Sequence, residues 1–145
     1  FLSAIYPLAE LIGLRELNLK KCPGIKDLSA LAQMRELAVL NISNCGPITD
    51  LTPLEGLSNL TNLGLSGCDK IEYLEPLANL QNLEILMIER CINLRSLLPI
   101  LNLPRLKQLW YTGDRTLIDK VQIELSNRNL ELKYAAGSTF LIQTS

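Results

Sequence analysis

Residues 37–59 read LAVLNISNCGPITDLTPLEGLSN, and the chain returns to this pattern every 23 residues over four repeats. Self-similarity at a fixed spacing of about 20 to 50 residues is the signature of repeat architectures. The four cysteines occupy one column of the aligned repeats, and seven further columns are also apolar in every repeat. These columns begin at Leu14, Leu17, Leu19, Cys22, Ile25, Leu28, Leu31 and Met34. The sequence therefore predicts a stack of near-identical units.

Each unit reads L-x-x-L-x-L-x-x-C-x-x-I-x-x-L-x-x-L-x-x-L-x-x. Its first part alternates with a period of two, which predicts a short strand with one buried face. Its second part is apolar at every third residue, which favours a 3₁₀ turn or an extended bend over a regular α-helix. Pro7, Pro53, Pro76 and Pro99 share a column in this second part, where proline fixes φ and begins a tight turn. The 33 leucines among 145 residues are thus explained by the repeat.

On these motifs the sequence resembles the leucine-rich repeat family over residues 2 to about 117. Residues 40–54, LNISNCGPITDLTPL, resemble the cysteine-containing subclass found in substrate-recognition subunits of ubiquitin ligases. Residues 51–63, LTPLEGLSNLTNL, are more similar to the compact repeats of internalin-type bacterial surface proteins and of some protist surface or effector proteins. The resemblance implies an α/β fold: a right-handed solenoid with a parallel concave sheet of about 5–6 short strands and a 3₁₀ or extended convex side.

Both ends depart from the repeat, which divides the chain into three parts. Residues 1–13 form an incomplete N-terminal repeat or cap, residues 14–105 form four 23-residue repeats, and residues 106–145 form a fifth repeat with a capping helix, a sixth strand and a tail. The first full strand, residues 14–20, would be an unprotected edge. We therefore expect the chain to be a fragment of a larger one.

The C-terminal part predicts an α-helix from Asp114 to Asn127. Asp114 or Thr116 is the expected N-cap, and four apolar residues follow at helical spacing: Leu117, Ile118, Val121 and Leu125. Leu132 and Tyr134 then stand 23 residues after Leu109 and Tyr111, which predicts a sixth strand. The tail, residues 135–145, is expected to help the helix seal this end of the stack.

Composition argues against an enzyme. The chain has no His, which excludes Ser-His-Asp and Cys-His centres and any His-ligated metal. Successive cysteines are 23 residues apart rather than paired as in zinc sites, so they are interpreted as small buried core residues. The carboxylates are scattered, and no glycine-rich phosphate loop is present. We expect no catalytic residues, no cofactor and no bound metal.

Charge and hydropathy restrict the partners. A net charge of -1 gives no reason to expect nucleic acid, and no apolar run approaches the roughly 18 residues needed to enter and cross a membrane. Unpaired buried thiols favour a reducing compartment such as the cytoplasm, while a surface or secreted location stays open. Another protein is the expected partner.

The candidate binding surface is the exposed face of the predicted sheet, where each strand presents three side chains. Across the strands they form three columns: Glu16, Val39, Asn62, Ile85 and Gln108; Asn18, Asn41, Gly64, Met87 and Trp110; and Lys20, Ser43, Ser66, Glu89 and Thr112. Ile85, Met87 and Trp110 form the one apolar cluster predicted outside the core, which is typical of a binding hot spot. The predicted partner-binding residues are Ile85, Met87, Glu89, Arg90, Trp110, Gln108, Thr112, Val39, Asn41 and Asn62.

Two alternatives stay open at this stage. The tail around Phe140 and Leu141 would cover Trp110 if that residue serves the cap rather than a partner. For the whole chain, the leading hypothesis is a protein–protein interaction module that binds through its concave sheet. The alternative is the recognition or regulatory arm of a larger enzyme, such as a ubiquitin ligase or a secreted effector, with catalysis outside these residues.

Overall fold

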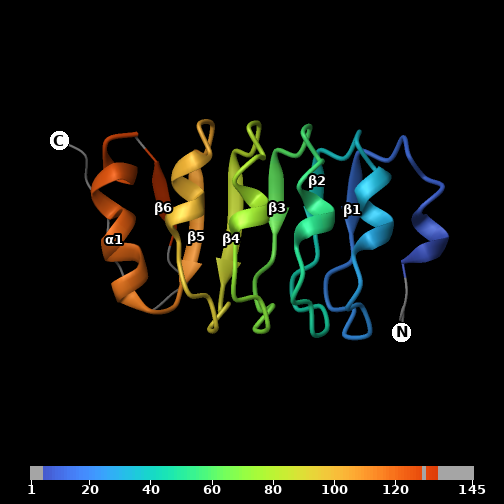
Figure 1. Ribbon diagram of the computed structural model, residues 1–145, viewed down its shortest axis with the longest axis horizontal. Helices are drawn as coiled ribbons and strands as arrows, with labels where there is room; N and C mark the ends of the chain where they lie inside the picture. Colours follow the sequence, from blue (N-terminus) through green and yellow to red (C-terminus); the bar gives the residue numbers. More distant parts are fainter. Residues whose placement is uncertain (1–4, 129, 134–145) are drawn as a thin grey trace.

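The computed structural model describes residues 5–128 and 130–133, which contain one six-stranded parallel sheet whose strand order follows the sequence. The strands are β1 (Glu16–Asn18), β2 (Val39–Asn41), β3 (Asn62–Gly64), β4 (Ile85–Glu89), β5 (Gln108–Thr112) and β6 (Glu131–Lys133). Neighbouring strands pair residues that are 23 apart in sequence, for example Leu40 with Leu63. Each repeat therefore adds one strand (Figure 1), and the predicted parallel sheet is confirmed.

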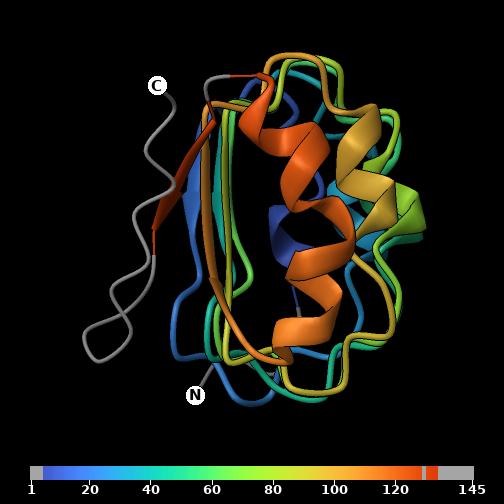
Figure 2. The ribbon, with the colours of Figure 1, turned by 90° about the vertical axis from the view of Figure 1, so that its left-hand side faces the viewer.

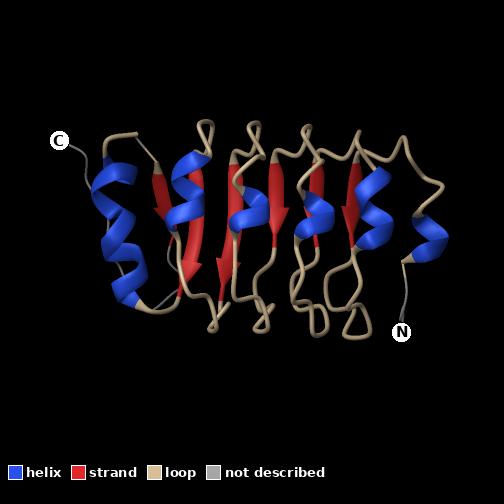
Figure 3. Ribbon diagram, in the orientation of Figure 1, coloured by secondary structure: helices blue, strands red, loops and turns tan. Residues whose placement is uncertain are grey.

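A second layer covers one face of the sheet (Figures 2 and 3). It contains five 3₁₀ turns, η1 (Tyr6–Leu8), η2 (Ser29–Gln33), η3 (Thr52–Leu54), η4 (Glu75–Leu77) and η5 (Leu98–Asn102), and the helix α1 (Arg115–Ser126). Proline stands at the start of η1, η3, η4 and η5. The predicted 3₁₀ side is thus confirmed. We call the opposite, solvent-facing side of the sheet the concave face.

At one column of the repeat, the residue before the N-cap of a 3₁₀ turn bonds through its side chain to the backbone at the start of the turn. The carboxylates of Asp27 and Asp50 accept the backbone N–H two residues on, each at 2.8 Å, and the Ser96 hydroxyl accepts in the same way at 3.1 Å. The bond to the Ser29 backbone lowers the pKa of Asp27, and hydrogen bonds to the side chain and backbone of Thr52 lower the pKa of Asp50. In the third repeat Tyr73 occupies this column and supplies no such cap.

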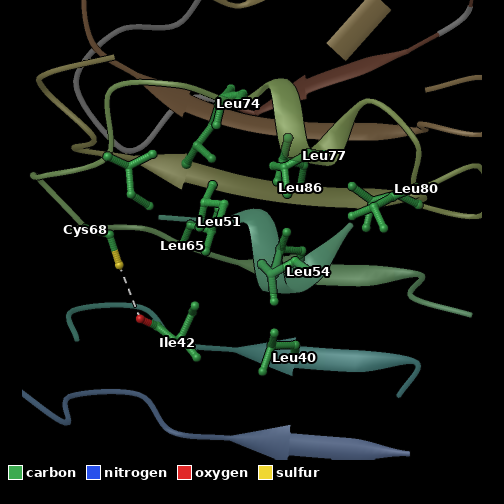
Figure 4. Close-up of a cluster of buried hydrophobic side chains, with 14 of the residues drawn as sticks. Leu40, Ile42, Leu51, Leu54, Leu65, Cys68, Leu74, Leu77, Leu80 and Leu86 are labelled. Atoms are coloured by element: carbon green, nitrogen blue, oxygen red, sulfur yellow. Dashed lines mark hydrogen bonds between the residues drawn. The ribbon is translucent and has the colours of Figure 1, made fainter. Parts of the chain in front are cut away.

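The core lies between the two layers, and Figure 4 shows it around repeats 2 to 4. The inner residues of the central strands, such as Leu63 and Leu65, are fully buried. The thiol of Cys68 donates to the Ile42 carbonyl of the preceding repeat at 3.3 Å, and Cys91 donates to Leu65 at 3.2 Å. Because burial disfavours the thiolate, it raises the pKa of Cys68 to about 11 and that of Cys91 to about 12. These cysteines are free core residues, as predicted.

The helix α1 covers the last repeat as the sequence predicts. The Asp114 side chain accepts the Thr116 N–H at 2.8 Å, which makes it the N-cap, and Asn127 is the C-cap. All four predicted apolar residues of the helix are buried. The sixth strand is also confirmed, while the tail expected to seal this end lies outside the described residues.

The opposite end of the stack differs. β1 is the outermost strand, as expected, and it pairs only with β2 among the described residues. Tyr6, Leu11 and Ile12 near this end are 62 %, 48 % and 61 % exposed. No helix in the described ranges has the length and apolarity needed to cross a membrane.

Candidate functional site

The concave face brings together the residues predicted to form the apolar cluster. Between β4 and β5 the register sets Met87 opposite Trp110 and Ile85 opposite Gln108. Between β3 and β4 it sets Asn62 opposite Ile85. These side chains therefore lie side by side on one surface.

Exposure on this face is lower than expected. Nine of the ten predicted site residues are half-buried, and Arg90 alone among them is exposed. The prediction that Ser43 and Gly64 reach solvent is wrong, because both are buried. Two side chains cover Gly64: Asn41 Oδ1 lies 2.9 Å, and Ser43 Oγ 3.1 Å, from where a Cβ on Gly64 would stand. The same Asn41 oxygen accepts the Ser43 N–H at 3.0 Å. Both side chains thus lie over the end of β3.

Polar site residues are fixed by contacts within the sheet. Glu89 accepts a hydrogen bond from the Ser66 hydroxyl at 3.2 Å. Gln108 donates to Glu131 at 2.9 Å. Such bonds hold each side chain in one rotamer before any partner arrives, which reduces the entropy lost on binding.

The rim where the strands end carries a column of left-handed residues. Lys21, Asn44, Gly67 and Arg90 have φ of 64°, 54°, 74° and 57°. Left-handed backbone favours glycine and is uncommon for Lys and Arg. The Nη2 of Arg90 donates to Asn44 Oδ1 at 3.1 Å, so the Arg90 side chain reaches across the repeat that holds Gly67.

Exposed apolar side chains that the sequence reasoning missed lie after β3 and β4, in the loops and at the start of η5. Tyr73, Ile92 and Leu98 are 54 %, 71 % and 53 % exposed, and the Arg95 guanidinium lies 5.8 Å from the Tyr73 ring centre. The repeat columns hold the missed signal, because Ile92 stands where other repeats have Pro23, Gly46 and Asp69.

Four carboxylates of the described residues form ion pairs, such as Glu72 with Arg95 at 2.7 Å and Glu84 with Lys107 at 2.8 Å. No group of three or more potential metal ligands is found within the described ranges. Phe140 and Leu141, expected to cover Trp110 if it serves the cap, lie outside the described part of the chain.

Comparison with known proteins agrees with this geometry. Residues 12–56 and 35–79 each match the family described as Leucine Rich repeats (2 copies). A search of curated proteins found no match.

Among solved structures, an internalin (inlF) from Listeria monocytogenes is 26 % identical, with a TM-score of 0.71 over 91 % of this chain and 37 % of that one. Internalin C2 from the same species is 23 % identical, with a TM-score of 0.63 over 94 % of this chain and 70 % of that one. A leucine-rich repeat protein of Leptospira interrogans is 20 % identical, with a TM-score of 0.61 over 87 % of this chain and 38 % of that one.

Proposed function

Because this chain belongs to the leucine-rich repeat family, we propose that it binds another protein through the concave face of β2 to β5. The family makes it a protein-interaction module in general terms, and the proposal adds the surface. The predicted contact residues are Ile85, Met87, Glu89, Arg90, Trp110, Gln108, Thr112, Val39, Asn41 and Asn62.

The composition of this face carries the proposal. Of the twelve residues in its three columns on β2 to β5, only Glu89 is charged. Interface cores are depleted of charge and enriched in aromatic residues and Met. Met87 and Trp110, paired in register, match that description. The polar residues around them are amides and hydroxyls, which suit a rim of hydrogen bonds.

Rigidity supports binding by a preformed surface. The sheet rests on a continuous core, and its side chains are held by bonds such as the one between Ser66 and Glu89. Six strands about 4.8 Å apart span about 25 Å. This width suits a standard interface of about 800 Å² per partner.

A second candidate is the recognition or regulatory arm of a larger enzyme, with catalysis outside these residues. It is favoured by one observation: the chain spans only 37 % of the internalin (inlF) structure and 38 % of the Leptospira one. The sequence of the full gene product tests it, because a catalytic domain on the same polypeptide would support this candidate. Further repeats followed by a surface anchor would support an adhesin instead.

Photo-crosslinking tests the proposed surface. A photoreactive phenylalanine analogue replaces Asn62 on the concave face or, as control, Glu55 beside η3 in the other layer. We expect one cross-linked protein from position 62 and none from position 55. With that protein purified, Met87→Ala should weaken binding about tenfold, and Glu55→Ala should leave it unchanged. Cross-links from position 55 alone, or unchanged binding by a folded Met87→Ala variant, would reject the concave face.

A further inference from the structure

Arg90 is a positioned cation without an acidic partner among the described residues. Its side chain donates to the neutral amide oxygen of Asn44 at 3.1 Å, and its backbone N–H donates to the Thr112 hydroxyl at 3.0 Å. The nearest carboxylate along the chain, Glu89, already accepts a hydrogen bond from Ser66. By contrast, Arg95 is paired with Glu72 at 2.7 Å. Arg90 is thus held in place while most of its donors stay available.

The position of Arg90 depends on a gap in the repeat between it and Asn44. A Cβ on Gly67 would stand 2.3 Å from Asn44 Oδ1 and 3.7 Å from the Arg90 Nη2. A side chain at position 67 would displace the amide that orients the guanidinium. Glycine at this position therefore lets Arg90 extend along the rim and reach Asn44, two repeats away.

An exposed apolar residue follows Arg90 closely in sequence. Ile92, two residues further on, is 71 % exposed, and the Gly46 and Asp69 of its column in the second and third repeats show that the fold does not require an apolar residue there. Met87 lies at the middle of β4, three residues before Arg90. An exposed isoleucine two residues from an arginine that has no acidic partner among the described residues complements a carboxylate flanked by an apolar side chain.

We infer that the rim of the fourth repeat recognises an acidic side chain of the protein partner, with the carboxylate on the Arg90 guanidinium and the adjoining apolar residue on Ile92. This inference deepens the proposed function and depends on it. Arg is suited to the role because its fork of donors binds carboxylates in bidentate fashion. On this view, Arg90 and Ile92 on the rim select an acidic partner, while Met87 and Trp110 supply most of the apolar contact on the concave face.

A pair of tripeptides tests the recognition directly. Acetyl-Asp-Leu-Leu-amide and acetyl-Asn-Leu-Leu-amide are titrated into the ¹⁵N-labelled chain, and shifts are followed by NMR at the Arg90 Nε and the Gly67 and Ile92 amides. We expect the Asp peptide to bind at least about tenfold more tightly than the Asn peptide, because it alone forms charge-assisted hydrogen bonds. Arg90→Gln should abolish this preference. Equal binding of the two peptides, or a preference that survives Arg90→Gln, would overturn the inference.

Three controls sharpen the result. Arg105→Gln removes another guanidinium that donates to an asparagine, Asn82 at 2.8 Å, on the other rim, and should leave the Asp preference intact. Glu89→Gln removes a neighbouring negative charge and should tighten Asp-peptide binding about twofold. Acetate alone should bind more weakly than the Asp peptide, and equal shifts from acetate would overturn the role of Ile92.

Failure of this inference can be told from failure of the proposed function. If position 62 cross-links a partner whose affinity is unchanged by Arg90→Gln, the concave face stands and the acidic recognition falls. If the Asp peptide binds through Arg90 but position 62 yields no cross-link, the proposed concave interface falls and the rim acts alone.

Discussion

The first and third repeats carry the same inner pattern but differ in burial. Leu17 in β1 and Leu19 just after it are 9 % and 7 % exposed, whereas Leu63 in β3 and Leu65 just after it are at 0 %. The difference arises because β3 has a strand on both sides and β1 is paired on one. In a stacked protein, stability is thus carried by the contacts between units as well as by the sequence of each unit.

The cysteine column shows the same contrast. Cys22 is half-buried, while Cys91 is 2 % exposed and bonded to the preceding repeat. We expect a thiol reagent to modify Cys22 at least about a thousandfold faster than Cys91, whose labelling requires local opening. Labelling followed by peptide mass spectrometry measures the two rates. Similar rates at both positions would show that the fourth repeat opens as readily as the first.

The raised pKa values of Cys68, about 11, and Cys91, about 12, also predict how the free energy of unfolding depends on pH. A thiol whose folded pKa is raised binds its proton more tightly in the folded state. Its contribution to stability is complete below the ordinary thiol pKa near 9 and is lost as pH rises towards 11 and 12. Urea unfolding at pH 8 and pH 10.5 should show lower stability at the higher pH, and less of a loss in Cys91→Ala. Equal losses in the two proteins would contradict burial of this thiol.

Replacing equivalent leucines of the third and first repeats by alanine tests whether the two repeats differ in their contribution to folding stability. Leu63→Ala should cost about 4 kcal/mol, because the fully packed site cannot collapse around the cavity. Leu17→Ala should cost about 2 kcal/mol, since its strand has one neighbour and some solvent access already. Urea denaturation followed by circular dichroism measures both. Equal costs would mean that the end repeat is as well packed as the central one.

The repeat pattern predicted the sheet, its register, the 3₁₀ layer and the capping helix because each depends on local spacing. It also placed Met87 beside Trp110, since register follows from the 23-residue shift. Burial on the concave face was not predictable in this way. Gly64 lies under the Asn41 amide, whose rotamer no periodicity encodes. The contact between Arg90 and Asn44 joins residues 46 apart and depends on the glycine between them.

Gly67 offers a test of that long contact. Gly67→Ala should cost about 1–2 kcal/mol, because its φ of 74° is unfavourable for alanine and the new Cβ would meet Asn44 Oδ1. Gly56→Ala is the matched control, since nothing lies within 4 Å of a Cβ there, and it should be neutral or slightly stabilising. If the contact between Arg90 and Asn44 is lost, the Arg90 Nε resonance should shift in the Gly67 variant and stay in place in the Gly56 variant. An unshifted resonance would contradict the dependence of Arg90 on this glycine.

The helix α1 gives the C-terminal end a longer cover than the three-residue η1 gives the N-terminal end, and its N-cap is the smallest test of that difference. Asp114→Ala removes the acceptor for the Thr116 N–H and should lower the melting temperature by about 3 °C. This bond lowers the pKa of the Asp114 carboxyl, so its effect is present above the ordinary aspartate pKa near 4 and is lost as pH falls further. Asp119→Ala, which removes only an exposed pair with Arg115 at 3.7 Å, should change the melting temperature little.

Hydrogen exchange should then show faster opening of α1 in the Asp114 variant with β1 unchanged, because in a stack each unit contacts only its neighbours. If β1 opens faster as well, the two ends unfold as one unit, and the contrast between the repeats is one of packing rather than of local stability.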